Sequence, residues 1–340
     1  ILNNTYGYDF NKWFSDRFRK REKLLNVKNY LKIKKTKEMI YFESGWGKKT
    51  NTRQHISQKD FEDTNIAIME MKQWCKKHDI KCYIAYIPNY MQVKRSVIGL
   101  KNDVAENDNI AQRLNDYFKS KTFDFEIIDT HHEVVSRKFD TFYLNIYNPD
   151  VHPTDFGSYL VYKKTMEAIK NDIPDVKIST EDDYNIYCDG KMMYYHFYMN
   201  LERKISFFKN NLKSNKMNNK CYKNDYKYFL LKNIKNPVVT KNTEVGFSIE
   251  KSFTTDNENA IDKRISIIGT SYINGYSMHF LHSFKGVQKL RSNDDAPKEY
   301  CKYHNCFSLK FWEKRILDFK SDVVVFLIKD FSDGLFTINK

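Results

Sequence analysis

The chain has 340 residues, of which 41% are hydrophobic and 16% aromatic. A chain of this length and composition buries a large core, which excludes a disordered protein. Its formal charge of +14 raises the question of nucleic acid, but lysine and asparagine are spread along the whole chain and no DNA- or RNA-binding motif accompanies them. We therefore expect a solvated basic surface and no nucleic-acid partner.

The predicted elements of the first half alternate between helix and strand. Helical spacing of apolar residues and nearly continuous apolar runs predict, in chain order, amphipathic helices in 8–32, a short strand and glycine turn in 37–49, a helix over 60–79, a strand over 81–89, a helix over 109–121 and a strand over 125–130. The strands lack an alternating polar face, which is typical of strands covered on both sides.

The second half resumes this pattern after a polar stretch. The predicted elements are a helix over 156–171, a strand over 265–268, a helix from about 273, a strand over 286–292, a helix over 311–320 and a strand over 322–331. Between them, residues 172–262 show poor periodicity, so we expect an insertion or lid within one domain of 1–340. The alternation predicts an α/β fold, a parallel sheet flanked by helices.

The cysteines and apolar runs bear on the cellular compartment. No apolar run approaches the roughly 18 residues that a membrane-spanning helix needs. The chain begins at Ile1, without an initiator methionine, and we expect an N-terminal signal or anchor to precede it. No two of the six cysteines form a CxxC pair, which argues against a zinc ribbon or a thioredoxin-like site. Cys301 and Cys306 are either a small disulfide or free thiols.

Two loops carry the residue types of acyl-transfer chemistry. "NPDVHPTDFG" contains Asp150 and His152 just before a predicted helix, and "IIGTSYING" places Ser271 between a predicted strand and helix, two residues after Gly269. Ligands of parallel sheets bind where strands end and helices begin. A serine needs a base to attack an acyl carbon, an imidazole suits that role, and a carboxylate orients the imidazole. We therefore expect a triad of Ser271, His152 and Asp150.

The developing oxyanion needs hydrogen-bond donors near the serine. The backbone N–H of Ser271 is the first candidate. Tyr272, Asn274 and Arg291 are further candidates for oxyanion or substrate binding, by position alone, as is Asn293.

His131 and His132 also follow a predicted strand, and they are the rival candidates for the base. With Glu133 they suggest a metal, but adjacent histidines diverge and no further ligand has suitable spacing. We expect neither a metal nor another cofactor.

The two loops resemble known motifs. "DVHPTDFG" resembles the last conserved block of SGNH hydrolases, and "IIGTSY" resembles their first block. Their reversed order resembles the circularly permuted SGNH-like proteins of the alginate O-acetyltransferase group (AlgJ- and AlgX-like) and the related DHHW family. The segments "FNKWFSDRFRKREKLL", "YIAYIPN" and "SDVVVFLIKDFSDGLF" also resemble stretches of that group.

This resemblance implies a permuted SGNH-like fold and a serine-dependent O-acetyltransferase. It implies a polysaccharide acceptor outside the cytoplasm, in the periplasm or at the cell surface, and a membrane-bound partner that delivers the acyl group. Two departures stand out: Pro153 occupies a place where the group commonly has tryptophan, and no Gly-x-Asn-Asp block is present.

Two other functions remain open on the sequence. An SGNH-type esterase or deacetylase would use the same triad with water as acceptor. A non-catalytic, glycan-binding component of a surface-polymer assembly system would keep Asp150 and His152 for structure. The sequence does not indicate the oligomeric state.

Overall fold

A computed structural model of the chain describes residues 58–87, 110–121, 126–131, 133, 153, 155–189, 226–232, 238–245, 248–269, 272–291 and 309–328. By its internal contacts the chain divides into two units, Ile1–His55 and Ile56–Lys340. Every described residue lies in the second unit. The predictions for residues 8–49, and for Cys301 and Cys306, fall outside the described residues.

Helices and strands follow the predicted alternation. In chain order the elements are α3 (Gln58–Lys77), β1 (Lys81–Tyr86), α6 (Ile110–Ser120), β2 (Ile128–Asp129), α8 (Asp155–Asp172), the short 3-10 helix η2 (Glu181–Asp183), β3 (Tyr184–Asp189), β4 (Tyr226–Leu231), β5 (Val238–Val245), β6 (Ser248–Thr254), β7 (Ile261–Gly269), α10 (Ile273–His279), the 3-10 turn η4 (Phe280–His282), β8 (Phe284–Arg291), α12 (Leu309–Phe319) and β9 (Val323–Ile328). Among the described helices, none has the length and apolar character that crossing a membrane requires.

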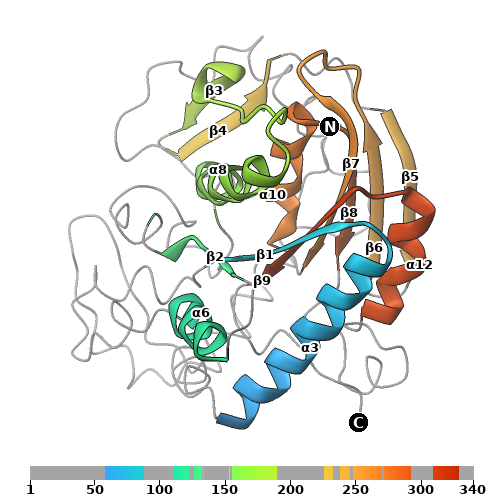
Figure 1. Ribbon diagram of the computed structural model, residues 1–340. Coiled ribbons are helices and arrows are strands. Elements are labelled where there is room, and N and C mark those ends of the chain that lie inside the picture. The colour runs from blue at the N-terminus through green and yellow to red at the C-terminus, as the bar shows by residue number, and fades with distance from the viewer. Residues whose placement is uncertain are drawn as a thin grey trace, which may run out of the picture. The chain divides into compact units, whose positions relative to one another are not determined.

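Within the described residues, seven strands form one sheet in the order β2-β1-β9-β7-β8-β6-β5 (Figure 1). The first five pair in parallel, as predicted. The last two, β6 and β5, extend the sheet by antiparallel pairing. The expected α/β fold is confirmed, with a mixed rather than an all-parallel sheet.

The antiparallel extension comes from the polar middle of the chain. The sequence predicts an insertion or lid in 172–262, but β5 and β6 belong to the main sheet. β5 reads VVTKNTEV and lies at the edge of the sheet. A strand that is partly solvated lacks the continuous apolar run by which the central strands are predicted.

The sheet buries both of its faces. Along β9, Val323, Val325 and Leu327 pack in one core cluster, whereas Val324, Phe326 and Ile328 pack in the other. This alternation follows from the two-residue period of a strand. α8 and α10 cover the first face, and α3, α6 and α12 cover the second (Figure 1). The fold is therefore a three-layer sandwich with a sheet as its middle layer.

A buried polar network ties the extension to the parallel core. On the α12 side of the sheet, Ser266 Oγ donates to Gln288 Oε1 at 2.6 Å, and Gln288 Nε2 donates to Glu250 Oε1 at 2.9 Å. The carboxylate of Glu250 also pairs with Lys241 at 2.8 Å and Arg315 at 3.4 Å. Because each polar group has a partner, the network fixes β7, β8, β6 and β5 side by side.

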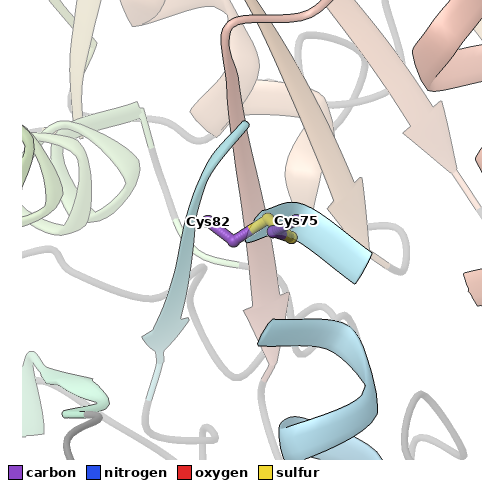
Figure 2. Close-up of a disulfide and its surroundings, with 2 residues drawn as sticks. All are labelled: Cys75 and Cys82. Carbon is purple, nitrogen blue, oxygen red and sulfur yellow. A yellow bond between two sulfur atoms is a disulfide. The ribbon is translucent and has the colours of Figure 1, made fainter. Parts of the chain in front are cut away.

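A disulfide joins Cys75, near the end of α3, to Cys82 in β1 (Figure 2). The two residues are seven positions apart, and their Cα atoms are 6.2 Å apart. Asp79, with a φ of 55°, takes the left-handed conformation that lets the chain reverse between helix and strand. From the sequence, only Cys301 and Cys306 were considered as a disulfide. The pairing of Cys75 with Cys82 was not predicted, because it depends on how tightly the chain turns between α3 and β1.

Candidate functional site

The carboxyl edge of the parallel strands is where the sequence predicts the site. Strands β1, β9, β7 and β8 run in the same direction, so their last residues lie at one edge. β7 ends there at Gly269, paired with Leu327 of β9 on one side and with Arg291 of β8 on the other. The chain then continues through residues 270 and 271 to Tyr272 and α10.

Gly269 has no room for a side chain. A β-carbon added there would lie 2.6 Å from Ile273 Cγ2 and 2.8 Å from the backbone oxygen of Leu327. The start of α10 therefore packs directly on the end of β7. The predicted role of this glycine, a tight approach of the backbone before the serine loop, is confirmed.

α8 runs back across the sheet, so its first turn lies at the same edge. The Tyr83 hydroxyl of β1 donates to Asp172 Oδ2 at 2.6 Å, which fixes the end of α8 near the beginning of that strand. The first residue of α8, Asp155, is buried and comes three positions after His152. The helix that follows the Asp-x-His segment thus starts toward the carboxyl edge.

The first turns of α8 and α10 are in contact. A β-carbon added at Gly275 would lie 2.9 Å from Ser158 Oγ and 3.7 Å from Asp155 Oδ1. Only a glycine allows this distance between the two helices. The two segments that carry the predicted triad, more than a hundred residues apart in sequence, therefore lead into helices whose first turns touch.

Buried hydrogen bonds hold α8 against α10 and against Ser283, which follows η4. The Tyr276 hydroxyl donates to Thr165 Oγ1 at 2.7 Å, and Tyr162 Oη lies 2.9 Å from Ser283 Oγ. Burial raises the pKa of both tyrosines above the ordinary value, so both remain neutral hydroxyls. The Tyr276 bond thus joins α10 to α8, and the Tyr162 bond joins α8 to the turn after η4.

A second sheet, formed by the antiparallel strands β3 and β4, packs on the same pair of helices. Tyr159 stacks on Phe229 with ring centroids 5.0 Å apart, and Tyr184 Oη lies 3.0 Å from His279 Nδ1 at the end of α10. Tyr184 Oη also lies 2.7 Å from Ser179 Oγ. His279 is therefore part of a packed aromatic cluster at the end of α10 opposite the serine loop.

The predicted site residues fall into two groups. Asp150, His152 and Ser271 lie outside the described residues. Tyr272 is buried at 2% exposure directly before α10, Asn274 is the second residue of that helix, and Arg291 is the last residue of β8. Pro153, which follows His152, is buried.

The rival base His131 lies on a different part of the edge. It follows β2, and β1 and β9 separate β2 from β7. Three strand spacings of about 4.8 Å put its backbone about 14 Å from the line of β7. The backbone N–H of His131 donates to Asp129 Oδ1 at 2.8 Å, and the Thr130 hydroxyl donates to the Tyr86 carbonyl oxygen. The neighbourhood of His131 is thus a compact turn over β1 and β2.

Two basic residues near this edge were not predicted from the sequence. Lys289 lies two positions before Arg291 in β8, and Lys251 of β6 pairs with Lys289 in register. The sequence does contain one indication of this pair: Lys289 and Arg291 are two positions apart in a predicted strand, and residues at that spacing lie on the same face of a sheet. The contribution of β6 was not predictable, since that strand was not predicted.

Comparisons with known proteins concern the fold. No protein-family profile matches this chain, and neither does the sequence of any curated protein. The structure of Bacillus cereus PatB1 with a sulfonyl adduct is similar, with 15% identity, coverage of 91% of this chain and 100% of that one, and a TM-score of 0.55.

Two further solved structures are similar at TM-scores below 0.5. A DHHW family protein from Eubacterium siraeum has 12% identity, 80% and 85% coverage of this chain and of that one, and a TM-score of 0.47. The O-acetyltransferase domain of Pseudomonas putida AlgJ has 13% identity, 85% and 89% coverage, and a TM-score of 0.44.

Proposed function

We propose that this chain is a serine-dependent O-acetyltransferase that moves an acetyl group onto hydroxyls of an extracytoplasmic polysaccharide, with Ser271 as the acyl carrier. The observation that carries the proposal is the contact between the first turns of α8 and α10, at Gly275, Ser158 and Asp155. Ser271 precedes α10 by two residues, and His152 precedes α8 by three. An extended chain spans about 3.6 Å per residue, so each of these short connections limits how far the proposed residue can lie from the helix that follows it. We therefore expect Ser271 and His152 to lie at the same edge.

The chemistry has two half-reactions with the same groups. Ser271 Oγ attacks the acyl carbon while His152 takes its proton, and the leaving group departs with that proton. The hydroxyl of the acceptor sugar then gives its proton to His152 and attacks the acyl-serine, which restores Ser271. Asp150 orients the imidazole and stabilises its protonated form. The backbone N–H of Ser271 is the first oxyanion donor, with Tyr272, Asn274 and Arg291 as candidates for the second.

Two observations support this assignment of roles. The rival base His131 follows a strand that two others separate from β7, which favours His152. The PatB1 structure of similar fold carries a sulfonyl adduct, and sulfonyl reagents react with activated nucleophiles such as a serine beside a base.

The disulfide between Cys75 and Cys82 supports the proposed location. Disulfides persist in oxidising compartments, such as the periplasm and the cell surface, and are rare in the cytosol. An extracytoplasmic enzyme has no access to cytosolic acetyl donors. We therefore expect a membrane-bound partner to deliver the acetyl group.

Labelling with phenylmethanesulfonyl fluoride, followed by mass spectrometry, tests the nucleophile. We expect one adduct on a peptide that contains Ser271, and none in Ser271→Ala. Ser277→Ala is a matched control, because Ser277 is a buried serine of α10 whose Oγ has no hydrogen-bond partner among the described residues. Unchanged acetyl transfer from an activated ester in Ser271→Ala would overturn the proposal.

An esterase is the second candidate, and Pro153 favours it. Proline follows the histidine in ordinary SGNH esterases, whereas the acetyltransferase group commonly has tryptophan there. The same acyl-serine would then be resolved by water. Measuring free acetate and acetylated oligosaccharide in one reaction separates the two functions, since a transferase forms more oligosaccharide product as acceptor concentration rises.

A further inference from the structure

Three cationic residues lie on one face of the sheet toward the end of β7. Lys251 of β6 pairs in register with Lys289 of β8, and Lys289 pairs with Ile267 of β7. Register partners point to the same side of a sheet. Because Ile267 packs in the core cluster of α8 and α10, Lys251 and Lys289 lie on that face, and so does Arg291, two residues after Lys289.

This cluster adjoins the end of β7, where the chain leads toward the proposed nucleophile. Arg291 is the register partner of Gly269, the last residue of β7. Ser271 follows Gly269 by two residues, which limits the distance between their Cα atoms to about 7 Å. Arg291 therefore lies at the end of the sheet from which the chain continues to the proposed nucleophile.

The charges of Lys251 and Arg291 have no counterion in the part of the chain that the structure describes. No ion pair there involves either residue, and the buried Arg291 Nε has no hydrogen-bond partner. Both lie beside a third cation, Lys289, whose pKa is lowered to about 7 by burial first and then by the charges of Lys251 and Arg291. Partly buried cations without counterions cost stability. Such an arrangement is favoured when a ligand supplies the missing negative charge.

We propose that Lys251, Lys289 and Arg291 form a subsite for a carboxylate or phosphate group carried by the acceptor glycan. The planar guanidinium of Arg291 offers a paired N–H contact to such a group, and the two ammonium groups add compact charge. The subsite would hold an acidic sugar with its hydroxyl beside the acyl-serine. This inference rests on the proposed function and names the class of acceptor.

Binding without turnover tests the subsite separately from the reaction. Isothermal titration calorimetry on the Ser271→Ala protein would compare three oligosaccharides of equal length: one with uronic acids, one with phosphate groups and one that is neutral. We expect an acidic ligand to bind about tenfold more tightly than the neutral one, because it adds charge-assisted hydrogen bonds that the neutral ligand lacks. The stronger of the two acidic ligands identifies the anionic group.

Variants locate the effect at the cluster. We expect Lys289→Gln and Arg291→Gln to reduce the preference for the acidic ligand about tenfold, and Arg291→Lys to retain part of it. Lys285→Gln is the matched control, because Lys285 lies on the same strand four residues earlier and its Nζ donates to Asn257 O at 2.7 Å. Thermal melting confirms that each variant is folded.

The outcomes distinguish the two proposals. Equal binding of acidic and neutral oligosaccharides would overturn the subsite, and so would a loss of preference in Lys285→Gln equal to that in the cluster variants. In either case, acetyl transfer by the wild-type protein would still support the proposed function. Charge-selective binding without any acetyl transfer or sulfonyl labelling overturns the proposed function and leaves a glycan-binding protein with this subsite.

Discussion

The backbone of Gly275 lies against the side chain of Ser158, so that a β-carbon at Gly275 would be 2.9 Å from Ser158 Oγ. This contact sets the spacing between α8 and α10. It therefore couples the two helices into which the Asp-x-His and serine segments lead.

Replacing Gly275 by alanine is therefore expected to disturb the helix pair. The clash costs about 1–3 kcal/mol, against about 1 kcal/mol gained in helix propensity. We expect a lower free energy of unfolding in urea and slower acyl-enzyme formation. Combining it with Ser158→Ala removes the nearest atom, and Ser158 Oγ has no hydrogen-bond partner among the described residues. The double variant should recover wild-type stability, and strictly additive single effects would contradict the contact.

Gly269→Ala tests the packing of the start of α10 on the end of β7. The new methyl group would meet the backbone oxygen of Leu327 at 2.8 Å, which has little freedom to move. We expect a loss of about 1–3 kcal/mol in stability, together with slower acetyl transfer.

Gly286→Ala is the comparison for this substitution. Its β-carbon would approach only side-chain atoms, the nearest being Arg264 Cγ at 2.9 Å. A flexible side chain moves aside at lower cost. Equal losses of stability in the two variants would show that the Leu327 backbone is not the cause.

Reduction of the disulfide should lower stability without abolishing the fold. Closing a loop of about eight residues stabilises by about 2.5 kcal/mol through the entropy of the unfolded chain. We expect dithiothreitol to shift urea unfolding of the wild type to lower concentration. The double variant Cys75→Ala/Cys82→Ala should show the lower stability with and without reductant. A wild type that is insensitive to reductant would mean that Cys75 and Cys82 are not joined.

Lys289 links pH to stability. Its pKa in the folded protein is about 7, below the ordinary value of 10.5. Between these two values the unfolded chain binds more protons, so the destabilising contribution of Lys289 is largest below pH 7 and declines as the pH rises toward 10.5. Lys289→Met should raise the melting temperature at pH 6 by more than at pH 9. A gain that is equal at both pH values would contradict the lowered pKa.

Much of the fold was predictable because its signals are local. Apolar runs such as Val323–Ile328 indicate strands buried on both sides, and helical spacing of apolar residues indicates α3, α6 and α12. The rule that ligands bind where parallel strands end assigns the serine loop to the carboxyl edge of the sheet from the order of the elements alone. The sequence by itself thus determined the α/β class, the order along the chain of the helices and parallel strands, and the two loops of interest.

Only the tertiary structure decided which elements are neighbours. The placement of β9 between β1 and β7, the antiparallel attachment of β6 and β5, and the contact of Gly275 with Ser158 each join distant parts of the chain. The register pairing of Lys251 with Lys289 also joins distant parts of the chain. The disulfide between Cys75 and Cys82 is local, but it depends on how one short turn closes. The periodicity of apolar residues indicates which side of a helix or strand is buried. It does not indicate which other element covers that side, because the neighbours of each element depend on packing across the whole core.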